Sequence, residues 1–164
     1  MGWTKFVASQ NYYSLASRDI EREIVPMALS ENISIMPWSP LSGGFLSGKF
    51  TRSQEIAGNS RRDTFDFPPI NKEKAYDIID VMAGIAKNHG VSVASVALNW
   101  VIKQPGVTST IIGAKTVSQL TDNISAVGLQ LTPEEMLQLG EVSALVSEYP
   151  GWMVTRQSAG RWPE

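Results

Sequence analysis

Cysteine is absent from the 164-residue sequence, and histidine occurs once, at His89. Without cysteine the chain has neither disulfides nor a catalytic thiolate, and a single histidine cannot build a histidine-based metal cluster. No apolar run reaches the roughly 20 residues of a membrane span, and residues 1–6 lack the apolar core of a secretion signal. These absences predict a cytoplasmic protein without a membrane partner.

Blocks of like charge are also absent, and the formal net charge is −2. A charge so close to zero gives no general attraction to nucleic acid. Hydrophobic residues make up 43% of the chain, which is typical of a soluble globular protein, and the length suffices for one sizeable core. We therefore predict one domain over residues 1–150 and an irregular tail over residues 151–164.

Hydrophobic periodicity predicts alternating strands and helices. The predicted strands cover residues 6–10, 33–38 and 108–112. The predicted helices cover residues 19–31, the stretch between Asn71 and Gly90, the stretch from Ser92 to Gln104, residues 117–127, and the stretch from Thr132 through Leu145. This alternation indicates an α/β fold with three parallel strands and flanking helices.

Individual residues refine these predictions. Pro26 should disturb the first helix, because its ring clashes with the carbonyl four residues earlier, and Asn32 should end it. Trp100 occupies a core-facing helical position. In the helix over residues 117–127, four apolar residues are expected on the core side: Val117, Leu120, Ile124 and Val127.

Three segments follow predicted strands, at the end where parallel α/β folds bind ligands. They are residues 9–13, 38–49 and 113–116. In the third, Gly113 permits close backbone approach, Lys115 adds a positive charge, and a helix begins near Thr116 with free N–H groups that attract anions. This pattern suits a phosphate site, although a threonine-capped turn with a surface lysine is the simpler explanation.

The second segment begins the long loop over residues 39–70, and loops of this length are usually functional or partly disordered. Trp38 offers a flat ring for stacking on a planar ligand. The loop then carries glycines that permit positive φ and four basic residues: Gly43, Gly44, Gly48, Lys49, Arg52, Arg61 and Arg62. The alternative is a core tryptophan followed by a flexible lid.

Two other polar residues have simple structural explanations. The Gln10 amide can pair with a ligand amide or merely cap a turn. His89 lies in the last turn of its predicted helix, where a favourable interaction with the helix dipole explains it.

The motifs "SQNYYSLASRDIEREIVP", "ISIMPWSPLSGGFLSGKF" and "STIIGAKTVSQLTDNISAVGLQLTPEE" together resemble the C-terminal part of aldo-keto reductases. The resemblance covers nearly the whole chain and implies part of a (β/α)₈ TIM barrel, containing its sixth to eighth strands. It also implies an oxidoreductase that uses NADP(H), extended and without a Rossmann fold, to reduce aldehydes and ketones by hydride transfer.

By this resemblance, Gln10 holds the nicotinamide carboxamide and Trp38 stacks on the nicotinamide ring. The remaining cofactor residues divide between the pyrophosphate and the adenosine end: Ser39, Leu41, Gly43 and Lys49 for the first, and Gly113, Ala114, Lys115, Gln119, Asp122 and Asn123 for the second. Well-studied eukaryotic members carry lysine and arginine where this chain has Gly113 and Gln119, which makes the preference for NADP(H) less secure. Lys115 is the expected substitute charge, and NAD(H) is the less favoured alternative.

The catalytic Asp, Tyr, Lys and His of the family come from its second to fourth strands, which have no counterpart in this sequence. The resemblance therefore implies a fragment without catalytic residues that is inactive alone on its carbonyl substrate. Its unpaired sheet edges imply self-association or a complementing chain. A non-catalytic nucleotide-binding or interaction module is the alternative, and an unrelated small α/β domain is the third reading.

Overall fold

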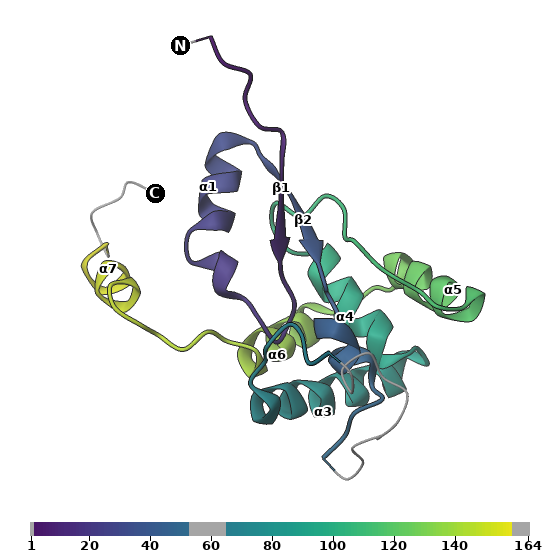
Figure 1. The fold of residues 1–164 in the computed structure, drawn as a ribbon. Coiled ribbons are helices and arrows are strands. Elements are labelled where there is room, and N and C mark those ends of the chain that lie inside the picture. The colour runs from purple at the N-terminus through teal and green to yellow at the C-terminus, as the bar shows by residue number, and fades with distance from the viewer. Residues whose placement is uncertain (1, 53–64, 159–164) are drawn as a thin grey trace.

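The computed structural model describes residues 2–52 and 65–158 (Figure 1). The elements, in chain order, are β1 (Ala8–Tyr12), the 3₁₀ helix η1 (Asp19–Glu21), α1 (Ile24–Glu31), β2 (Ser34–Trp38), the 3₁₀ helix η2 (Ser42–Ser47), α3 (Lys72–His89), α4 (Val93–Ile102), α5 (Val117–Ser125), the 3₁₀ helix η3 (Ala126–Gly128), α6 (Pro133–Val142) and α7 (Gly151–Ser158). The predicted α/β class is confirmed.

The sheet contains two parallel strands, with Gln10 opposite Met36 and Tyr12 opposite Trp38. Alternation along the strands separates two faces. One face carries Ile35 and Pro37, which are buried. The other carries Gln10, which is exposed, together with the half-buried Met36 and Trp38. The sheet is thus covered on one side and open on the side that carries two predicted ligand-binding residues.

The predicted third strand, residues 108–112, does not form a regular strand. Ile35 donates to the Gly106 carbonyl at 2.8 Å and accepts from Thr108 at 3.1 Å, as in a parallel ladder. The next donor on β2 would be Pro37, which has no N–H. Its carbonyl accepts from Ile111 at 2.8 Å, one residue later than an even ladder requires. Proline in the adjoining strand therefore reduces this pairing to one isolated bridge, between Ile35 and Val107.

The first predicted helix is divided into η1 and α1, as Pro26 requires. Pro26 is the third residue of α1, where a missing N–H costs nothing, and its ring would clash with the Arg22 carbonyl in a continuous helix. The helix ends at Asn32, which adopts the left-handed conformation with φ of 55°. Both predictions are confirmed.

The core joins the covered sheet face, against which α1 packs, to α3, α4 and α6. Asn71 and Ser92 cap α3 and α4 as predicted, and Gly90 ends α3 in the left-handed conformation. The predicted apolar stripe of α3 is buried, and Trp100 of α4 is 2% exposed. Burial of this stripe supplies most of the driving force for packing α3 against α4 and α6.

Three further predictions are wrong. The first strand begins at Ala8, two residues later than predicted, and Phe6 is exposed. Residues 151–158 are helical because Pro150 suits the start of a helix and its carbonyl accepts from Met153 and Val154. The expected core side of α5 faces outward, with Val117 81% exposed, because none of the residues described in the structure covers that face.

Candidate functional site

The three candidate segments lie at the same end of the sheet. Tyr12 and Trp38 are the last residues of β1 and β2 and lie opposite each other. The bond from Ile111 to the Pro37 carbonyl places the third segment beside the end of β2. Residues 9–13, 38–49 and 113–116 therefore form one carboxyl edge, as ligand sites of parallel α/β folds do.

Trp38 is surrounded by aromatic rings. The Tyr12 ring stacks on it with centroids 4.9 Å apart, and the Phe67 ring stacks on it at 5.8 Å with an angle of 10° between the planes. Phe65 continues the group, 5.4 Å from Phe67. Sequence reasoning missed Phe67, because nothing in the local pattern around it indicates a partner 29 residues earlier.

The loop after β2 is compact at its start. Ser39 accepts a hydrogen bond from the Gly43 N–H at 2.8 Å, and both residues have positive φ, 52° and 65°. The Leu41 carbonyl accepts from two later N–H groups of η2. Ser42 is fully buried. Its Oγ lies 2.8 Å from the Ser14 Oγ and accepts a hydrogen bond from the Tyr12 hydroxyl at 3.1 Å. These bonds attach the loop to the end of β1.

The loop also carries the predicted basic residues. Lys49 is exposed. Arg52 pairs with Glu73 at 2.7 Å and with Asp77, and these hydrogen bonds raise its pKa. Arg61 and Arg62 lie outside the described residues. Within the part of the loop that the structure describes, Lys49 is therefore the cation best placed to attract an anion.

The third segment is exposed throughout Gly113, Ala114 and Lys115. Thr116 caps α5 by accepting from the Gln119 N–H at 3.2 Å, as predicted. The Gln119 side chain turns back and accepts from the Lys115 N–H at 2.8 Å. An ammonium group thus stands beside a capped helix N-terminus, which is a favourable arrangement for an anion.

Two predicted residues of α5 have partners within the chain. Asp122 accepts from the Ser92 hydroxyl at 2.7 Å and from Ser95, both at the start of α4. Asn123 is 8% exposed and donates to the Gly113 carbonyl at 3.4 Å. Both side chains fix α5 and the loop before it in place.

A buried polar network supports the end of β1, and sequence reasoning missed it. Arg18 donates two hydrogen bonds to the Glu21 carboxylate, at 2.7 and 2.8 Å, and others to the Gly140 carbonyl and Ser143. The Tyr13 hydroxyl donates to the same carboxylate at 2.6 Å. Burial, followed by this hydrogen bond, raises the pKa of Tyr13. Its hydroxyl is therefore a structural donor at neutral pH.

His89 does more than the predicted dipole interaction. Its Nε2 lies 2.9 Å from both carboxylate oxygens of Glu135. Glu135 also completes the capping box of α6 with Thr132, whose backbone N–H lowers the pKa of that carboxyl. The contact joins the end of α3 to the start of α6.

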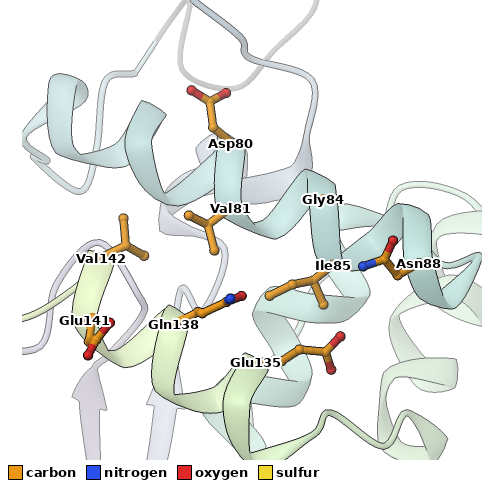
Figure 2. A pocket seen from close by; sticks show the side chains of 9 residues that line it. All are labelled: Asp80, Val81, Gly84, Ile85, Asn88, Glu135, Gln138, Glu141 and Val142. Carbon is orange, nitrogen blue, oxygen red and sulfur yellow. The ribbon is translucent and has the colours of Figure 1, made fainter.

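A hollow of about 630 Å³ lies between α3 and α6. Figure 2 shows its walls formed by side chains of these two helices alone, with Val81 and Ile85 facing Gln138. None of the residues predicted to bind a cofactor lines it. Its Asp and Glu side chains belong to the two helices that pack against each other, α3 and α6. We do not assign it a ligand.

Residues 2–52 and 65–158 contain neither a cluster of metal ligands nor a membrane-spanning helix. No group of three or more His, Asp or Glu side chains there is arranged to hold a metal ion. In the same residues, no helix combines the length and apolar character needed to cross a membrane.

Comparison with known proteins gives a family match. Residues 1–144 match the Aldo/keto reductase family. The versiconal hemiacetal acetate reductase of Aspergillus parasiticus is 31% identical over 151 residues, covering 92% of this chain and 44% of the relative. The uncharacterized oxidoreductase YrpG of Bacillus subtilis is 36% identical over 137 residues, covering 83% and 40%. The probable aldo-keto reductase 1 of Glycine max is 34% identical over 134 residues, covering 82% and 39%.

These alignments leave more than half of each relative unmatched. The chain spans 44%, 40% and 39% of the lengths of these three relatives.

Proposed function

Because the chain belongs to the aldo/keto reductase family, we propose that its carboxyl edge binds NADP(H) for carbonyl reduction by hydride transfer. One observation carries the proposal: Gln10 and Trp38 lie on the same open face of the sheet, where the three candidate loops meet. A planar ring and an amide on one face suit a nicotinamide, which needs a stacking surface and a partner for its carboxamide.

The phosphate groups of the cofactor would be held by the two remaining loops. Ser39, Leu41, Gly43 and Lys49 would form the side for the pyrophosphate, since a glycine without a Cβ lets a phosphate approach the backbone closely and Lys49 supplies charge. Gly113, Ala114 and Lys115 form the side for the adenosine phosphate, with the N-terminus of α5 behind them. When bound, the nicotinamide supplies the hydride chemistry.

Preference for NADP(H) over NAD(H) rests on Lys115 in this proposal. Its ammonium is exposed beside the cap of α5, and the extra phosphate of NADP(H) requires such a cation. Gln119, Asp122 and Asn123 would shape the adenosine end by fixing the loop and helix, through the bonds described above.

We assign no catalytic residue to this chain. A general acid must reach the reacting oxygen to within about 3 Å. The nearest tyrosine hydroxyls are committed elsewhere, Tyr12 to Ser42 and Tyr13 to Glu21. By the family resemblance, the acid would therefore come from barrel strands that this sequence does not contain. The corresponding alternative is a non-catalytic nucleotide-binding module.

We also propose a complementing polypeptide that supplies those strands. The outward face of α5 and η3 exposes Leu120, Ile124 and Val127, and a hollow of about 320 Å³ separates it from residues 107–110 and Ile112. Ile102 and Leu98 line the same hollow from α4. An exposed apolar surface of this kind is typical of an interaction site. Light scattering tests this: a well-behaved monomer with a full cooperative thermal transition would argue against it.

Calorimetric titration of the 164-residue chain tests cofactor binding. We expect NADPH to bind and Lys115→Ala to weaken NADPH more than NADH, because only NADPH carries the additional phosphate. Lys103→Ala is the matched control, since Lys103 is also exposed but follows α4 at the opposite end of the sheet. Equal losses for both cofactors would refute the role of Lys115, and absence of NADPH binding would refute the cofactor site.

An activity assay tests the missing acid. The chain alone should not reduce a simple aldehyde with NADPH. Turnover at an enzyme-like rate would show that the chain carries its own proton donor.

A further inference from the structure

Phe65 and Phe67 form a short aromatic segment near the end of the loop, and this segment contacts the proposed nicotinamide site at Trp38. Phe67 stacks on Trp38 with its ring inclined by 10° and its centroid 5.8 Å away. Offset stacking within this range is the preferred geometry of two aromatic rings. A nicotinamide ring is also planar and would use the same surface of the indole.

Phe67 does not belong to the hydrophobic core. Its side chain is 41% exposed, and neither Phe67 nor Trp38 is among the residues that form the buried cluster. The backbone N–H of Phe67 donates to the Phe65 carbonyl at 2.8 Å, so this bond stays within its own segment. The ring stacks on Trp38 outside the core, and its removal should therefore leave the core intact.

Tyr12 differs from Phe67 although it also stacks on Trp38. It belongs to β1, lies in register with Trp38, and its hydroxyl donates to Ser42. Moving Tyr12 would disrupt the strand pair and the bond to the loop. Of the two rings on Trp38, only Phe67 comes from a segment without a sheet partner.

We propose that Phe67 occupies the stacking position of the nicotinamide and competes with it for Trp38. The ring shields the indole from water while no cofactor is bound and sets a threshold that the nicotinamide must overcome. This inference rests on the proposed cofactor site and adds a residue that governs its affinity.

The test compares two ligands on the full chain by calorimetry. NADPH carries the nicotinamide ring, whereas adenosine 2′,5′-bisphosphate carries only the adenosine half. Phe67→Ala should tighten NADPH binding about two- to tenfold, the factor that corresponds to one aromatic stack, and leave the bisphosphate unchanged. Phe67→Trp, which offers a larger ring, should weaken NADPH binding and also leave the bisphosphate unchanged.

Phe6→Ala is the matched control, because it removes another exposed phenyl ring, 85% exposed, from the N-terminal segment before β1. It should change neither affinity. Far-UV circular dichroism checks that each variant is folded.

The outcomes separate this inference from the proposed function. If the bisphosphate binds and Phe67→Ala leaves NADPH affinity unchanged or weaker, the competition is refuted while the cofactor site stands. If neither ligand binds the wild-type chain or any variant, both proposals are overturned.

Discussion

A methyl group added at Gly48 tests the packing of the proposed pyrophosphate loop. Gly48 has φ of 82°, and a Cβ built there would lie 2.9 Å from the Val93 Cβ. Gly44 has a similar φ of 93°, but nothing lies within 4 Å of the corresponding position. The two glycines therefore share the backbone cost of an alanine and differ in the clash.

The free-energy cost of an alanine in the left-handed backbone conformation is small and common to both variants. A left-handed alanine costs about 1–2 kcal/mol, and the stiffer unfolded chain returns about 0.4–1 kcal/mol. Gly44→Ala should therefore lower the free energy of unfolding by about 1 kcal/mol or less. Overpacking against the branched carbon of Val93, which cannot rotate away, adds about 1–3 kcal/mol, so Gly48→Ala should lose about 1–4 kcal/mol.

Urea unfolding followed by far-UV circular dichroism measures both values. Val93→Ala in the Gly48→Ala background should recover part of the loss, because it removes the two methyl groups around the clash. If Gly44→Ala and Gly48→Ala differ by less than about 0.5 kcal/mol, the close approach of the loop to α4 is not part of the native packing.

Four further predictions concern the polar contacts. Arg18→Met should cost about 2–4 kcal/mol in urea unfolding, because Glu21, whose side chain is 24% exposed, loses a charged partner; a smaller loss in a Glu21→Gln background would confirm the pairing. Tyr13→Phe should hold its stability better than the wild type above pH ~10, since the unfolded tyrosine ionises near there while burial raises the folded pKa. Thr132→Ala should cost about 1 kcal/mol as a lost cap, seen as a lower urea midpoint. Because the Thr132 N–H lowers the pKa of Glu135, the stability difference between wild type and Glu135→Gln should shrink as pH falls below ~4.3.

The helices could be predicted because their signals are local. Asn71, Ser92, Thr116 and Thr132 each cap a helix through a side chain that accepts from an N–H three residues later. The irregularity of residues 108–112 could not be predicted, because strand pairing there depends on a residue of the neighbouring strand. Residues 108–112 have strand-like composition, but their ladder requires the N–H that Pro37 lacks.

For the candidate site, too, local features could be predicted and contacts between distant segments could not. The position of Trp38 at the carboxyl end of its strand follows from strand and helix order, and the structure has it there. The partners of Asp122 and the stacking of Phe67 on Trp38 depend on how distant segments pack. Periodicity carries no information on such contacts. The exposed side of α5 was mispredicted for a related reason, since amphipathic spacing identifies an apolar face but not what covers it.

The irregular pairing at Pro37 makes the two edges of the sheet unequal. β1 presents an extended strand, whereas the opposite edge has a register slip between Thr108 and Ile111. Continuous growth of a sheet requires two regular edges on every subunit. If copies of this chain met at high concentration, pairing through β1 would use the single regular edge of each copy and produce a closed twofold dimer. One proline in a neighbouring strand would thus protect an open-sided fold against fibril formation.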